Sequence, residues 1–175
     1  MITKLARLFP AVIVLCLLSA CNLQSKAPLF AETEGRLLLS SYGSTFASFT
    51  LVDGVWKPEN ETMTFNPSGM HYIASDGKAN ISVLFAPIDD HWWAAQALED
   101  GKSPNYSLVE ANAADIVVHP ISCKSLKESG KLDDFVVFNG DDCEVKEGTD
   151  RDVLFKMLAA SPDDASLKIV PVEVP

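Results

Sequence analysis

Turn-forming residues divide the middle of this 175-residue chain into short segments, with a turn signal about every 8 to 12 residues. The segments between them are rich in β-branched and aromatic residues, as in residues 45–52, which end at Asp53-Gly54. Residues 79–85 alternate in polarity before Pro87, a pattern typical of a strand with one buried face. Strands this short and this regularly interrupted predict an antiparallel sheet, a sandwich or a partial barrel.

The last third of the chain has a different character. Residues 122–129 predict a short helix that ends at Gly130. Thr149, followed three residues later by Asp152, is typical of the start of a second helix. Four apolar residues at helical spacing follow it: Val153, Leu154, Met157 and Leu158. We therefore expect an α+β protein, mainly antiparallel β, with a short helix and a C-terminal helix packed on the sheet.

The first twenty residues look like a targeting segment. Lys4 and Arg7 form a basic start, and residues 8–18 form an apolar stretch too short to span a bilayer comfortably. Ser19 and Ala20 then supply the small residues that a signal-peptide cleavage site needs. We expect residues 1–20 to be a signal peptide that contributes nothing to the mature fold.

The run Leu18-Ser19-Ala20-Cys21 resembles the lipobox of bacterial lipoprotein precursors. The resemblance implies cleavage before Cys21 and lipidation of that cysteine, which becomes the first residue of the mature protein. Two other interpretations stay open: an uncleaved N-terminal anchor, or an ordinary signal peptide with Cys21 unlipidated. In this class aspartate after the cysteine favours the inner membrane, and Asn22 therefore favours the outer membrane, facing the periplasm.

The sequence predicts three parts. After the signal peptide, residues 21–35 mix polar residues with no clear period, so we expect a lipidated N-terminus and a flexible tether of roughly 20 Å average span. Residues 36–175 are expected to form one β-rich domain, in which residues 36–121 are mainly β and residues 122–175 form an α+β lobe. The lipid alone would then hold the protein at the membrane.

The charge of the chain argues against two classes of partner. Its formal charge is −10, and removal of residues 1–20, with two basic residues and no acidic one, makes it −12. Such acidity disfavours nucleic acid and anionic lipid headgroups. A basic protein partner, cations, or solubility alone remain compatible with it.

Two cysteines remain in the expected domain. Cys123 and Cys143 are 20 residues apart, and an envelope compartment is oxidising, so we expect a disulfide between them. A redox or metal-binding pair is the alternative, although there is no Cys-x-x-Cys motif. The disulfide would stabilise the fold by roughly 3 kcal/mol.

Motifs of catalysis and cofactor binding are missing, so we expect no cofactor and favour a non-enzymatic role. Asp89, Asp90 and His91 are the densest group of potential metal ligands, and His71 and His119 stand alone. Adjacent residues of a strand point to opposite faces, so we expect a solvated turn there and no metal site.

Trp92 and Trp93 must face opposite sides of any strand that contains both. An outward-facing tryptophan could bind an envelope protein or a glycan, whereas core packing of both is the simpler interpretation. The leading functional hypothesis is thus a lipid-anchored interaction or structural module of the cell envelope. An envelope hydrolase and a small-ligand-binding lipoprotein are the alternatives.

Overall fold

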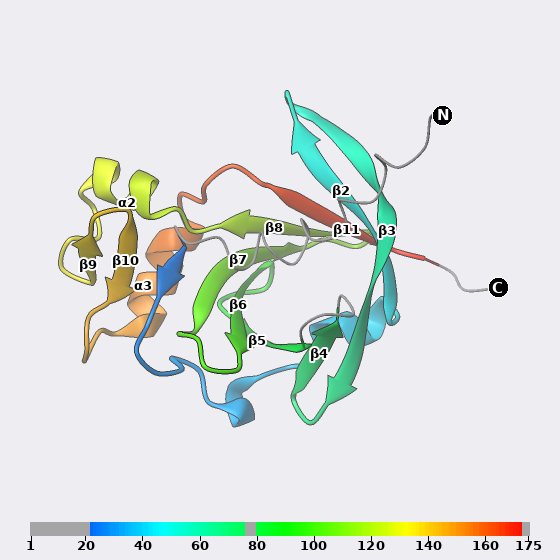
Figure 1. Cartoon of the computed structure of the whole chain (residues 1–175), viewed down its shortest axis with the longest axis horizontal. Helices are drawn as coiled ribbons and strands as arrows, with labels where there is room; N and C mark the ends of the chain where they lie inside the picture. The colour runs from blue at the N-terminus through cyan, green and yellow to red at the C-terminus, as the bar shows by residue number, and fades with distance from the viewer. Residues whose placement is uncertain (1–21, 76–79, 173–175) are drawn as a thin grey trace, which may run out of the picture.

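The computed structural model describes residues 22–75 and 80–172 (Figure 1). Eight antiparallel strands close into a barrel. In chain order they are β2 (Thr45–Val52), β3 (Val55–Ser68), β4 (His71–Ser75), β5 (Asn80–Pro87), β6 (Trp92–Glu99), β7 (Asn105–Ala111), β8 (Ile116–Pro120) and β11 (Leu167–Pro171).

The barrel follows the chain in an up-and-down order. From β2 to β8 each strand pairs with the next, and β11 closes the ring between β8 and β2. The register places Ile169 of β11 opposite Ile116 of β8 and Ser48 of β2. The predicted fold class, α+β and mainly antiparallel β, is confirmed, with a closed barrel as its sheet.

The first barrel hairpin shows how local sequence sets the turns. Asp53 and Gly54 have φ values of 54° and 76°. Positive φ at both central residues is the geometry of a two-residue type I′ turn, and Asp-Gly is among its preferred sequences. The turn between β2 and β3 is therefore encoded by the dipeptide that predicted it.

Two hydrophobic clusters lie on the two faces of the barrel wall. On β5, Val83 and Phe85 face one cluster while Leu84 and Ala86 face the other, as strand alternation requires. The barrel core comprises Leu39, Phe46, Phe65, Tyr72, Ala74, Ile81, Val83, Phe85, Ala95, Ala97, Val109, Ile116, Val118, Leu167 and Ile169. The outer core comprises Leu23, Phe30, Leu84, Ala86, Ala94, Tyr106, Leu108, Ile121, Cys123, Leu126, Leu132, Val136, Cys143, Val145, Leu154, Phe155 and Leu158.

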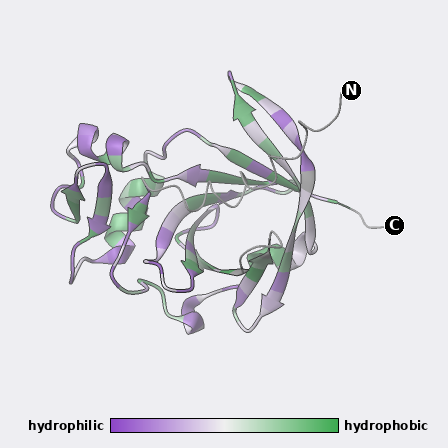
Figure 2. Ribbon diagram, in the orientation of Figure 1, coloured by the Kyte–Doolittle hydropathy of each residue, from purple (hydrophilic) through white to green (hydrophobic). Residues whose placement is uncertain are grey.

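A small lobe covers the outer core at one end of the long axis (Figure 1). It consists of α2 (Cys123–Ser129), β9 (Val136–Asn139), β10 (Asp142–Val145) and α3 (Arg151–Ala159). Figure 2 shows α2 as mostly hydrophilic and α3 as more hydrophobic. Among the described residues, no helix is both long and apolar enough to cross a bilayer.

One of the two helix starts predicted for the lobe is confirmed, and the other lies one residue later than predicted. The Ser122 side chain caps α2, and Gly130 ends that helix with a φ of 61°. For α3 the cap is Asp150 and not the predicted Thr149, because the Asp150 carboxylate accepts from the backbone N–H groups of Asp152 and Val153. The buried face of α3 consists of Leu154, Phe155 and Leu158, whereas Val153 and Met157 are exposed.

The N-terminal segment corrects the expectation of a flexible tether at residues 21–35. Residues 22–36, which we call the strap, pack against the domain, and Cys21 lies outside the described residues. Within the strap, β1 (Leu23–Gln24) runs parallel to β10 and also pairs with β7, and η1 (Glu32–Glu34) follows. A second turn, η2 (Leu38–Ser41), then leads into the barrel. The composition of the strap did not predict this packing, because few strap residues are apolar and their partners lie far away in the sequence.

Candidate functional site

Polar contacts hold the strap to the domain, beginning at the residue after Cys21. Asn22 has 2% of its surface exposed and forms an antiparallel bridge with Ser122. The Leu23 N–H donates to the Ile121 carbonyl at 3.1 Å, and the Leu23 side chain is fully buried. The described chain is therefore fixed to the domain from its first residue.

A buried glutamine holds the middle of the strap. The Gln96 side chain is buried on the outer face of β6, where its Oε1 accepts from the Phe30 N–H at 3.0 Å. Its Nε2 donates to the Phe30 carbonyl at 3.1 Å. Both backbone groups of Phe30 are thus satisfied by one amide, much as a neighbouring strand would satisfy them.

Tyr106 on β7 also binds the strap, and we call Gln96 and Tyr106 together the clamp. The Tyr106 hydroxyl accepts from the Leu29 N–H at 3.0 Å and donates to Gln96 Oε1 at 3.2 Å. The same hydroxyl lies 2.7 Å from the Ser25 hydroxyl. Burial raises the pKa of the Tyr106 phenol, because the phenolate would lose its hydration. The neutral hydroxyl is therefore a stable part of the network.

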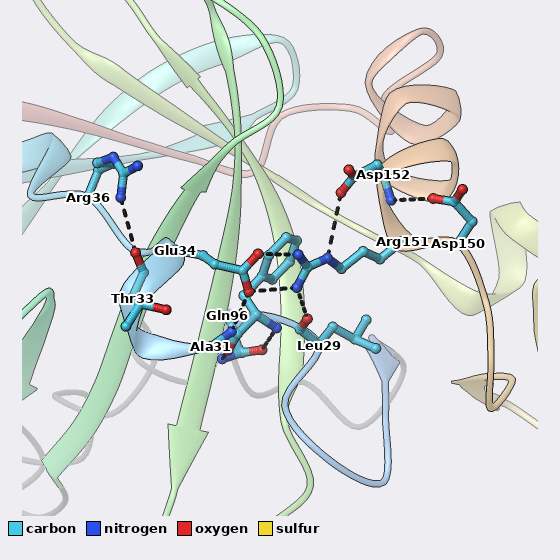
Figure 3. Close-up of polar contacts among 10 residues, drawn as sticks. Leu29, Ala31, Thr33, Glu34, Arg36, Gln96, Asp150, Arg151 and Asp152 are labelled. Carbon is cyan, nitrogen blue, oxygen red and sulfur yellow. Dashed lines mark hydrogen bonds and ion pairs between the residues drawn. The ribbon is translucent and has the colours of Figure 1, made fainter.

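Arg151, the first residue of α3, also binds the strap (Figure 3). Its guanidinium forms a bidentate pair of hydrogen bonds with the Glu34 carboxylate and donates to the Leu29 carbonyl. The guanidinium carbon also lies 5.0 Å from the centre of the Phe30 ring. The Arg151 hydrogen bonds, together with one from the Ala31 N–H, lower the pKa of Glu34. Three kinds of contact from one side chain thus converge on the strap.

The predicted disulfide is present beside the strap. Cys123 at the start of α2 bonds to Cys143 of β10, with 5.4 Å between the Cα atoms. Cys143 is also the register partner of Leu23 in β1. The disulfide therefore joins the two segments of the lobe that contact the first residues of the strap.

The two tryptophans lie on opposite faces of β6, as strand alternation predicts. Trp93 packs against the barrel core, and Trp92 packs against the outer core with its ring 5.1 Å from that of His119. Both are half-buried. Only Trp92 faces outward and could form part of a binding surface.

The Asp89-Asp90-His91 run forms a turn between β5 and β6. Asp89 Oδ1 accepts from the N–H groups of His91 and Trp92, at 2.8 and 2.7 Å, and these bonds lower the pKa of Asp89. Asp90 and His91 are exposed. Among the described residues, no group of three or more histidine, cysteine or acidic side chains could hold a metal ion.

The other two histidines each lie near one carboxylate. His71 Nδ1 is 3.5 Å from Glu32, and His119 Nε2 is 3.7 Å from Glu110. The backbone carbonyl of Asp163 lies 2.8 Å from His119 Nδ1, which orients that ring. Each pair has the separation of a weak ion pair.

A small cavity lies within the barrel core. Its volume is ≈ 20 Å³, and its lining is apolar, with Met63, Phe65 and Val109 among the side chains. This space would hold about one water molecule, and a cavity without polar groups stays dry. The cavity is a packing defect of the core, too small for an organic ligand without movement of its walls.

Sequence reasoning missed the residues that hold the strap: Glu34, Gln96, Tyr106 and Arg151. One signal was present, because Gln96 is a lone amide within the apolar run of residues 94–98. A polar side chain on a buried strand face must find hydrogen-bond partners. Its partners at Phe30 lie 66 residues away, so the sequence could not identify them.

Comparison of the chain with protein-family models, with curated proteins and with solved structures found no match.

Proposed function

We propose that this protein is a lipid-anchored component of the bacterial cell envelope whose mature domain is a non-enzymatic interaction or structural module. The observation that carries the proposal is the lipobox-like run Leu18-Ser19-Ala20-Cys21, which follows a basic start and an apolar stretch. The contacts described above are made by residues from Asn22 onward. Cleavage before Cys21 would therefore remove no residue of the described domain.

Physical arguments support both the compartment and the anchor. Disulfides such as Cys123–Cys143 persist in oxidising environments, which include the bacterial periplasm. Each buried CH₂ of an acyl chain contributes about 0.8 kcal/mol, so two or three chains on Cys21 would give an effectively permanent anchor. Asn22, in place of aspartate, supports placement on the outer membrane, facing the periplasm.

The module interpretation is supported by where the polar groups converge. Gln96, Tyr106 and Arg151 direct their hydrogen bonds to the strap and not into a cleft. Each histidine–carboxylate pair joins a buried or partly buried histidine to an exposed carboxylate. This arrangement stabilises the attachment of the strap and favours an interaction or structural module over a hydrolase.

The anchor is tested by acyl labelling of the full chain in a bacterial host. Cys21→Ala should abolish incorporation of labelled fatty acid and release the mature domain from the membrane fraction or leave the precursor uncut. Cys16→Ala is the matched control, since Cys16 would leave with the signal peptide, and it should label like the wild type. Labelling that survives Cys21→Ala would contradict the proposal.

The interaction surface is tested by cross-linking in the envelope followed by affinity recovery. Trp92→Ala should reduce recovery of a partner, because Trp92 lies on the outward face of β6. Trp93→Ala alters the barrel core and serves as the control for general loss of packing. Equal recovery from the wild type and Trp92→Ala would exclude that face.

A further inference from the structure

We propose that the domain is held directly against the bilayer, with α2 and the β9–β10 turn beside the lipid headgroups. This inference rests on the proposed function, because it takes Cys21 as the lipidated residue. It concerns the orientation of the domain, which lipidation alone does not determine. A lipid on a flexible tether would leave every face of the domain free to meet the membrane.

The first observation is the distance between the anchor and the domain. Consecutive Cα atoms are 3.8 Å apart, so the Cα of the lipidated residue lies about 4 Å from that of Asn22. Asn22 is buried, and its bridge to Ser122 fixes it at the start of α2. The acyl chains would thus leave the domain at a fixed point without a spacer.

The second observation is the strength with which the rest of the strap is held. Release of the strap would break the β1 pairings, the clamp by Gln96 and Tyr106, and the contacts of Arg151. It would also expose Leu23 and Phe30, which are now buried. If it were free, a 15-residue strap could extend about 50 Å at most. Because the strap is folded against the domain, the anchor cannot extend that far from it.

The third observation identifies the surface that faces the lipid. Because β1 is parallel to β10 and Leu23 lies opposite Cys143, Asn22 lies at the Asp142 end of β10, next to the β9–β10 turn. Exposed groups there include Lys124, Asn139, Asp141 and Asp142. This surface is more acidic than basic, so the covalent anchor imposes the contact, and attraction to anionic headgroups does not.

The opposite end of the molecule would point away from the membrane. Figure 1 shows the lobe at one end of the long axis, and β3 and the end of β11 at the other. Val172 follows β11 there, with 39% of its surface exposed. Lys127 on α2 is exposed and lies about 8 Å along the helix from Ser122. These two positions therefore report on the near and far ends.

The experiment uses the acylated full-length protein, purified from membranes and reconstituted in zwitterionic phosphatidylcholine vesicles with an acceptor dye on the headgroups. A donor dye is attached at Lys127→Cys or at Val172→Cys, one per sample. The matched control carries a 14-residue Gly/Ser spacer after Asn22, followed by a second Asn that can pair with Ser122. The spacer adds roughly 20 Å of flexible span.

We expect energy transfer from position 127 to exceed that from position 172 by at least about twofold, and the spacer to abolish the difference by adding a flexible span comparable to a small domain. Equal transfer from both positions in the acylated protein without the spacer would overturn the fixed orientation alone. A spacer without effect would do the same. Absence of acylation at Cys21, seen by mass spectrometry before reconstitution, would overturn the proposed function as well.

Discussion

The barrel core and the outer core are built from opposite kinds of contact. The barrel core joins strands that are mostly neighbours in the chain, and its members are apolar except for the Tyr72 hydroxyl. The outer core joins residues 23–30 to residues 121–158 over the outer face of the barrel wall. It also depends on a disulfide, a buried amide and an ion pair.

This difference suggests different modes of failure. A closed barrel leaves no free edge strand, so loss of one barrel contact strains the whole ring. The strap and the lobe are attached to one side of that ring, and they can open while the barrel remains folded. We expect the outer core to be the less stable unit, in the sense of local unfolding.

The sharpest test replaces one phenylalanine of similar burial in each core. Phe46 and Phe155 are 0% and 1% exposed, and each contacts other aromatic rings. Replacement of a buried phenylalanine by alanine costs about 3–5 kcal/mol. Phe46→Ala should lower the free energy of global unfolding by that amount, whereas Phe155→Ala should lower mainly the protection of the strap and lobe.

Hydrogen exchange read by mass spectrometry distinguishes the two outcomes. In Phe155→Ala the faster exchange should be confined to residues 22–36 and 121–160. If β2 to β5 exchange faster to the same degree, the two cores form one cooperative unit and the comparison fails.

The predictability of the two cores from the sequence follows the same division. Strand alternation and the Asp53-Gly54 turn are local signals, so the strands of residues 45–120 were visible in the sequence. The strap was not, because Leu23 pairs with Cys143 of β10 and Glu34 is paired with a residue 117 positions away. Of the groups that hold the strap and the lobe, the sequence predicted only the disulfide, since two cysteines in the expected domain leave one possible pairing.

The next largest effect should come from the disulfide. In the chain-entropy model, a bridge between residues 20 apart stabilises by about 3 kcal/mol. The double variant Cys123→Ala and Cys143→Ala should lower the stability of the lobe by that order, measured by urea unfolding. Because Cys143 pairs with Leu23, exchange at β1 should rise as well. Unchanged protection at β1 would show that the strap is held independently of the lobe.

Gln96 provides a smaller test that removes polar contacts and keeps the shape. Gln96→Met retains the length of the side chain and leaves the Phe30 N–H and carbonyl without their partner. A buried unsatisfied group costs about 1–3 kcal/mol, so the strap should detach more readily. The Phe30 amide should lose most of its exchange protection, while amides of β3 keep theirs. If the Phe30 amide stays protected, the apolar contacts alone hold the strap.

The smallest effect should be a difference in acid sensitivity. Arg151 lowers the pKa of Glu34 in the folded protein, so the pair stabilises the strap fully above the ordinary glutamate pKa of about 4.3. That stabilisation is lost as the pH falls through the lowered folded value, because protonated Glu34 no longer attracts Arg151. Glu34 is 37% exposed, so the loss should be at most about 1 kcal/mol.

Asp89 supplies the matching group in the barrel, since hydrogen bonds from Trp92 and His91 also lower its pKa. Exchange between pH 5 and pH 3, corrected for the intrinsic rate, should accelerate in the strap of the wild type and less in Glu34→Gln. Asp89→Asn should leave the acid response of the strap unchanged and alter that of the β5–β6 turn. If Glu34→Gln and the wild type respond alike, the ion pair does not hold the strap, and its attachment depends on Gln96, Tyr106 and the apolar contacts of Leu23 and Phe30.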